Sequence, residues 1–177
     1  DPDFADFDYT LKRIADSKAH VLSEGEERLM ALVSDVLGGF HDVFSMLDDA
    51  NLNLPKEKYN GKSVQMSHGL YGLVLHEGTA DERRKWFKKY YKAYINIIDA
   101  LTQTYYGNVK KDIFAKTARN YPSCLAMAMD GEDVSPVVYE NLVEAVHGAL
   151  PNVHEYISLR QKLLGLPKQH MYDLYIP

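Results

Sequence analysis

Apolar residues recur every three or four positions through most of this 177-residue chain, and this helical period constrains its fold more than any other feature. The longest periodic segment starts near residue 80. Its main stripe consists of Trp86, Tyr90, Tyr94, Ile97, Leu101 and Tyr105, and Phe87, Tyr91, Ile95 and Ile98 form a second stripe beside it. A helix that is apolar over so wide an arc is typical of one lying between other helices. We therefore expect one long central helix from 80 to about 118, roughly 60 Å long at 1.5 Å per residue, with Gly107-Asn108 as its weak point.

Signals at helix ends predict several more helices. SEGE (23–26) and TADE (79–82) are capping boxes, in which the first and last side chains satisfy each other's backbone N–H groups. Gly38-Gly39 is expected to end the helix that SEGE starts, with a third helix following around FHDVFSMLDDA. The remaining expected helices cover 4–22, 67–78, 122–130 and 136–149, and a last one begins or is kinked at Pro151 and ends at 165–167. The fold class predicted is all-α, a bundle of seven or eight helices.

Residues 51–66 break the helical period. Asn60-Gly61 is the strongest short signal for a β-hairpin, because both central positions of a type I′ turn need positive φ. We expect one small β-hairpin near 56–66, with a loop containing one tight turn as the alternative.

Composition excludes some classes of protein. Hydrophobic residues make up 46% of the chain, which supports a core and argues against disorder. The net charge of −5 gives no sign of a nucleic-acid or membrane partner, and we expect no apolar stretch near the roughly 20 residues that span a bilayer. Cys124 is the only cysteine, so an internal disulfide and a cysteine-based zinc site are both excluded. We read Cys124 as a small packing residue and not as a nucleophile.

Two stretches start like the zinc motif of a metallopeptidase and do not complete it. In H-E-x-x-H, two histidines four apart bind zinc and the glutamate acts as general base. His154-Glu155 is followed at the required position by Ser158, and His76-Glu77 by Ala80. Glu144 and His147 form an E-x-x-H pair, but a dinuclear site in a helical bundle needs two such pairs and two further carboxylates. We expect these histidines to lie on helix surfaces without a metal.

One helix combines basic and aromatic residues. Its basic residues are Arg83, Arg84, Lys85, Lys88, Lys89 and Lys92. Such a combination can bind single-stranded nucleic acid, but residues 85, 88, 89 and 92 share the face opposite the aromatic stripe, which is typical of a solvated surface. We expect no nucleic-acid partner. The thirteen tyrosines suit a wet groove that binds a polypeptide backbone, although ordinary packing explains any single one as well.

Long stretches of the chain resemble the oligoendopeptidase F family of zinc metallopeptidases, which are thimet oligopeptidase-like. The stretches that carry this resemblance are LSEGEERLMALVSDVL, FSMLDDANLNLP and the run from GNVKKDIFAKTARNYPSC through NLVEAVHGALPNVHEYISLR to LLGLPKQHMYDLYIP. The resemblance covers essentially the whole chain and is strongest from Gly107 to Pro177.

The resemblance implies an almost wholly helical enzyme that cleaves short unstructured peptides in a deep channel. It implies a catalytic zinc bound by an H-E-x-x-H motif and a later glutamate, all beyond the part that this chain resembles. No catalytic or metal residue is therefore assigned, substrate-binding residues stay unknown, and the fragment is expected to bind no zinc and to be inactive alone. It further implies that 1–115 form an N-terminal helical domain, that 116–177 are the first helices of the catalytic domain, and that the remainder of that domain is a partner.

Two further expectations accompany this reading. A cytoplasmic location is expected for the intact enzyme, and helices 136–165 are expected to expose apolar surface made for the missing lobe. The alternative is a stand-alone helical module that binds peptides or proteins without catalysis. Such a module would be expected to end in a polar tail, whereas this chain ends in Leu174-Tyr-Ile-Pro177.

Overall fold

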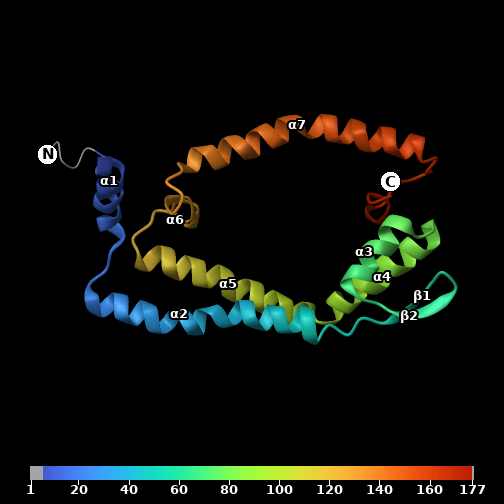
Figure 1. Ribbon diagram of the computed structural model, residues 1–177, viewed down its shortest axis with the longest axis horizontal. Coiled ribbons are helices and arrows are strands. Elements are labelled where there is room, and N and C mark those ends of the chain that lie inside the picture. The colour runs from blue at the N-terminus through green and yellow to red at the C-terminus, as the bar shows by residue number, and fades with distance from the viewer. Residues whose placement is uncertain (1–5, 177) are drawn as a thin grey trace. The chain divides into compact units, whose positions relative to one another are not determined.

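The computed structural model describes residues 6–176, and within them it is all-α apart from one two-stranded antiparallel hairpin (Figure 1). The α-helices are α1 (Asp8–Ser17), α2 (Glu24–Ser45), α3 (His68–Glu77), α4 (Ala80–Asn96), α5 (Ile98–Ala118), α6 (Cys124–Asp130) and α7 (Pro136–Leu163). Short 3₁₀ turns cover Lys18–His20 and Met171–Asp173, and a π-helical turn covers Met46–Ala50. The fold class expected from the sequence is confirmed.

The chain divides into two compact units, which are described separately. One comprises Asp1–Val43 with Gln103–Leu142, and the other comprises Phe44–Thr102 with Val143–Pro177.

In the first unit, α5 runs alongside α2 (Figure 1). Arg119, just beyond α5, donates two hydrogen bonds to the carboxylate of Glu27 on α2, both at 2.9 Å. The His20 ring stacks on Tyr121 with ring centres 3.6 Å apart. Arg13 of α1 pairs with Asp130 at the end of α6. The helices of this unit carry few buried side chains, and polar contacts near the helix ends connect them to one another.

The second unit contains the hairpin and the best-packed core of the described chain. β1 (Lys56–Tyr59) and β2 (Lys62–Gln65) pair antiparallel, and the turn residues Asn60 and Gly61 have φ of 51° and 75°. The predicted hairpin is therefore confirmed. Trp86 of α4, fully buried, packs with Met66 and Val74 and donates its indole N–H to the carbonyl of Lys58 at 2.9 Å.

The capping boxes start their helices as expected. Ser23 and Glu26 exchange hydrogen bonds at the start of α2, and Thr79 and Glu82 do so at the start of α4. Ser67 caps α3, which ends at Gly78. The helix expected from 122 begins two residues later, at Cys124, because Ser123 caps α6 and Pro122 precedes that cap.

The long helix expected from 80 to 118 is two helices, and the break is not at Gly107. It falls at Ile97, whose φ and ψ of −118° and 20° leave the helical region. Gly107 is buried inside α5, where a Cβ would overlap the ring of Phe40 on α2. The glycine therefore permits the close approach of two helices. The break instead lies among three isoleucines around Asn96, and isoleucine has a lower helix propensity than straight-chain residues.

At two other places the helix continues past the residue where we expected it to end. α2 continues through Gly38-Gly39 to Ser45, so no separate third helix exists there. Each glycine costs a helix only about 1 kcal/mol relative to alanine, and Phe40 beyond them packs against α5. Likewise, Pro151 lies inside α7, so the alternative in which it begins the last helix is wrong. The first expected helix is shorter than 4–22, and residues 4 and 5 lie outside the described part.

One helical stretch of the described chain, Glu24–Ala50, is long and apolar enough to cross a membrane by length and composition. The expectation that no stretch approaches this length is wrong here, because Asp35 and Asp42 divide an apolar run that continues around them. A single helix of this kind is weak evidence for a membrane, since core helices and signal sequences meet the same criterion.

Candidate functional site

The two incomplete zinc motifs lie on surfaces and form no site. His154, Glu155 and Ser158 are exposed on α7, where the serine hydroxyl donates to the carbonyl of His154 at 2.8 Å. His76 and Glu77 end α3, so Ala80 belongs to the next helix and could not complete a one-helix motif.

The E-x-x-H pair is equally exposed. Glu144 and His147 lie on α7, and neither belongs to a group of metal-ligating side chains within residues 6–176. Within residues 6–176, these sequence motifs therefore form no group of metal ligands.

Helix α4 has an exposed basic face and a buried aromatic face, as the residue spacing predicts, and Arg83 is the one exception. Lys85, Lys88, Lys89 and Lys92 are exposed, whereas Trp86 is buried. Arg83 does not belong to this face. It is 5% exposed and donates to Asp173 at 2.8 Å and to the carbonyl of Gly78 at 2.7 Å.

This buried ion pair anchors the C-terminal turn Met171–Asp173 on α4. Asp173 also accepts from the backbone N–H of His170. Sequence reasoning missed the pair, because nothing in the spacing connects two residues 90 positions apart.

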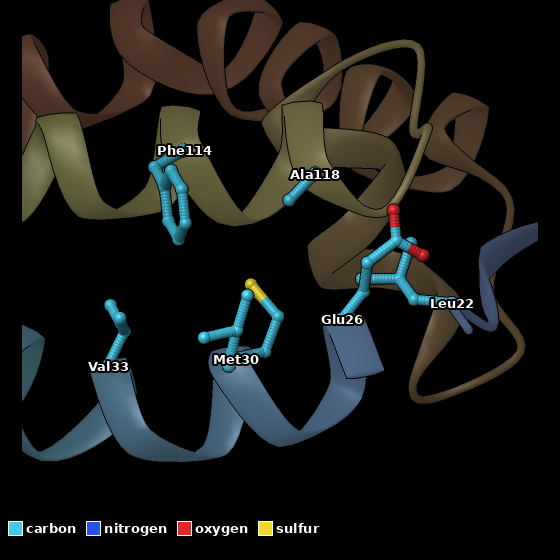
Figure 2. A pocket seen from close by; sticks show the side chains of 7 residues that line it. Leu22, Glu26, Met30, Val33, Phe114 and Ala118 are labelled. Atoms are coloured by element: carbon cyan, nitrogen blue, oxygen red, sulfur yellow. The ribbon is translucent and has the colours of Figure 1, made fainter. Parts of the chain in front are cut away.

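An apolar groove lies between α2 and α5 and has a volume of about 250 Å³ (Figure 2). Its lining residues are Leu22, Glu26, Leu29, Met30, Val33, Phe114 and Ala118. Met30 and Val33 point from α2 toward α5, and Phe114 points back (Figure 2). The only charged group, Glu26, is held by Ser23, and the hydrogen bonds from that residue lower the pKa of the carboxyl. The groove could accept an apolar side chain, but it presents no group suited to catalysis.

Tyrosines gather on one side of α4. Tyr71 of α3 stacks on Tyr90 with ring centres 3.8 Å apart, and Tyr90 contacts Tyr91 and Tyr94. Burial raises the pKa of both Tyr71 and Tyr94. The hydroxyls of Tyr90 and Tyr94 face each other at 3.3 Å, and that of Tyr94 donates to Asp48 at 2.6 Å. These two hydroxyls therefore satisfy internal partners instead of lining an open groove for a peptide backbone.

Helix α7 carries more exposed large apolar side chains than any other described helix. None of its 28 residues, all of them described, is buried. Its exposed large apolar side chains are Val137, Val138, Tyr139, Leu142, Val143, Val146, Leu150, Val153, Tyr156, Leu159 and Leu163. Soluble proteins rarely leave so long a stripe open to water. The exposure expected for helices 136–165 is confirmed.

Comparison with known proteins indicates which class of protein this chain resembles. The family model described as Oligopeptidase F matches residues 1–53. Oligopeptidase PepF of Bacillus subtilis (strain 168) is 36% identical over 97% of this chain, and Group B oligopeptidase PepB of Streptococcus agalactiae is 32% identical over 99%. The crystal structure of oligoendopeptidase-F from Enterococcus faecium superposes over the whole chain with a TM-score of 0.92 and 34% identity. The fold and the relatives are those of bacterial oligopeptidases.

Over its whole length the chain is similar to the N-terminal part of oligoendopeptidase F proteins. A putative peptidase from Chlamydophila abortus, 25% identical, has the same fold with a TM-score of 0.93. The chain spans only 26% and 30% of the length of the two curated relatives and 35% of the Enterococcus structure.

Proposed function

We propose that the intact protein is a zinc-dependent oligoendopeptidase of the cytoplasm that hydrolyses short unstructured peptides, and that this chain forms part of the wall of its substrate channel. The oligopeptidase relatives support the reaction class. In such an enzyme a bound zinc supplies a nucleophilic water and polarises the peptide carbonyl. This chain has no H-E-x-x-H motif, so its own contribution would be to shape the channel and exclude folded proteins.

The observation that carries this proposal is the uncovered apolar stripe of α7 in a chain that spans less than a third of its curated relatives. A helix normally buries its apolar stripe against another element. The proposal assigns that cover to the remainder of the catalytic domain, with 116–177 as the first helices of that domain and 1–115 as the N-terminal helical domain.

The test compares the intact protein with the 177-residue chain. The intact protein should cleave a short fluorogenic peptide, lose activity when a chelator removes zinc, and leave a stably folded protein uncut. The 177-residue chain should be inactive on the same peptide and should bind a hydrophobic dye more strongly than an ordinary folded protein. An intact protein that retains full activity without metal, or that degrades folded substrates, would contradict the proposal.

A further inference from the structure

The two edges of the β-hairpin differ in how their backbone groups are satisfied. β1 packs against α4 (Figure 1), and Trp86 of α4 donates its indole N–H to the carbonyl of Lys58 at 2.9 Å. The backbone N–H of Lys58 donates to the carboxylate of Glu57 at 2.7 Å. The backbone groups at the middle of β1 that do not pair with β2 therefore already have partners.

The turn fixes which residue pairs of the hairpin exchange hydrogen bonds. Tyr59 and Lys62 face each other across the two-residue turn, and the closing pair of such a turn is hydrogen-bonded. Hydrogen-bonded and non-hydrogen-bonded pairs alternate along antiparallel strands. At the other end of the ladder the N–H of Met66 donates to the carbonyl of Pro55 at 3.2 Å, an even number of residues from the closing pair, as this alternation requires.

β2 consequently presents two residues whose backbone groups face solvent. Ser63 and Gln65 occupy the alternate positions that are not hydrogen-bonded to β1, so the N–H and carbonyl of each point away from it. Both residues are exposed, and none of these four groups has a hydrogen-bond partner among the residues that the structure describes. Donors and acceptors repeated at every second residue are the pattern on which an extended polypeptide adds a further strand.

The charges around this edge indicate what it would accept. Lys56, Lys58 and Lys62 are exposed. The one carboxylate of the two strands, that of Glu57, is paired with the ammonium group of Lys89 at 2.6 Å. Two copies of the same edge would bring their lysines together, so the charge opposes self-pairing and favours an acidic partner.

We propose that the outer edge of β2 binds an extended acidic segment of polypeptide as a third strand. The backbone groups of Ser63 and Gln65 supply the hydrogen bonds, and the exposed lysines attract the acidic side chains. The edge is already formed in the free chain, because Val64 between them packs against the core around Trp86. A nucleic acid would match the charge but has no peptide backbone to continue the ladder. The site goes beyond the proposed peptidase activity, because it requires neither zinc nor the remainder of the enzyme.

The test measures binding of a fluorescein-labelled short peptide of alternating glutamate and valine to the purified 177-residue chain, by fluorescence anisotropy. We expect saturable binding that weakens as the salt concentration rises. The same peptide with its backbone amides N-methylated keeps its charges but cannot donate to a strand, so its affinity should fall at least about tenfold. A peptide of alternating lysine and valine should not bind.

Variants of the protein locate the site. Ser63→Pro removes an outward N–H without breaking a bond to β1, since proline is tolerated at such edge positions, and it should weaken binding about tenfold. Ser63→Ala keeps the N–H and should bind as the unchanged chain does. Lys58→Gln combined with Lys62→Gln should weaken binding about fivefold at low salt. Lys162→Gln, which neutralises an exposed lysine on α7, should leave it unchanged.

The emission of Trp86, the only tryptophan of the chain, shows whether each variant keeps its hairpin docked on α4. A chain that does not bind the acidic peptide would overturn the proposal. Binding that ignores both N-methylation and Ser63→Pro would also overturn it, as would a single-stranded oligonucleotide that binds as tightly as the peptide. Each of these results would leave the proposed peptidase activity standing, because that activity is measured by cleavage in the intact protein.

Discussion

Helix α7 and the α3–α4–hairpin region both carry many apolar residues, but they differ in how far those residues are buried. In the α3–α4–hairpin region, Trp86 and Val74 are fully buried, and even the charged Arg83 is enclosed with its partner Asp173. Helix α7 is longer than any element of that region and buries nothing. The difference teaches that local sequence specifies the secondary structure of both regions, whereas only one of them buries its apolar side chains within the described residues.

The largest effect should come from removing the centre of the buried core. Trp86→Ala should lower the free energy of unfolding by about 3–5 kcal/mol, because it leaves a cavity and orphans the carbonyl of Lys58. Leu142→Ala on α7, where the side chain is 61% exposed, should change it by less than about 0.5 kcal/mol in this chain. Chemical denaturation followed by circular dichroism measures both. Equal costs for the two substitutions would remove the distinction between the regions.

The buried ion pair gives the next largest effect. Asp173→Asn leaves the Arg83 guanidinium enclosed without a countercharge and should cost on the order of 3 kcal/mol. Asp81→Asn is the matched control, since its partners Arg84 and Lys85 are exposed and such pairs contribute under about 1 kcal/mol. The same denaturation measurement applies. A cost for Asp173→Asn no larger than that for the control would show that the C-terminal turn is not anchored by this pair.

Replacing two helical glycines by alanine should have smaller effects on stability, and these effects should be opposite in sign. Gly107→Ala places a Cβ against the Phe40 ring and should destabilise the chain by about 1–3 kcal/mol. Gly148→Ala on α7 meets no atom within 4 Å and should stabilise it by up to about 1 kcal/mol through helix propensity. Thermal denaturation of both variants tests this. A stabilised Gly107→Ala variant would show that Phe40 moves aside freely.

The smallest expected effect is a pH dependence in the hairpin. The hydrogen bond from Lys89 lowers the pKa of Glu57, whose carboxylate also accepts from the backbone of Lys58. A carboxyl with a folded pKa below its unfolded value of about 4.3 contributes stability above that value and loses it as the pH falls through the folded pKa. Glu57→Gln should therefore flatten the decline in stability below about pH 4.3. Glu155→Gln, which removes an exposed α7 carboxylate without a described partner, should leave the curve as steep as before.

Local rules predicted much of this fold. Capping boxes at Ser23 and Thr79, the Asn60-Gly61 turn and the helical period are short-range signals, and each gave the element expected. The errors at Gly38-Gly39 and Gly107 share one cause, because a residue that weakens a helix ends it only when packing does not compensate. Pro151 differs, because it lies inside α7, a helix that buries no side chain. Gly107 is needed for the approach of Phe40, which no local rule reveals.

The sites were less accessible to sequence reasoning. The Arg83–Asp173 pair depends on residues far apart in the chain meeting after folding. The exposed face of α7 was predictable, because its apolar stripe is visible in the sequence and the resemblance implies a partner outside this chain.

Hydrogen exchange of α7 tests the central claim most directly. The amides of residues 136–163 should exchange rapidly in the 177-residue chain and at least about tenfold more slowly in the intact protein, since buried elements open less often. The amides of α3 and α4 should be equally protected in both. Equal protection of α7 in the two proteins would contradict the claim that α7 is completed by the remainder of a peptidase.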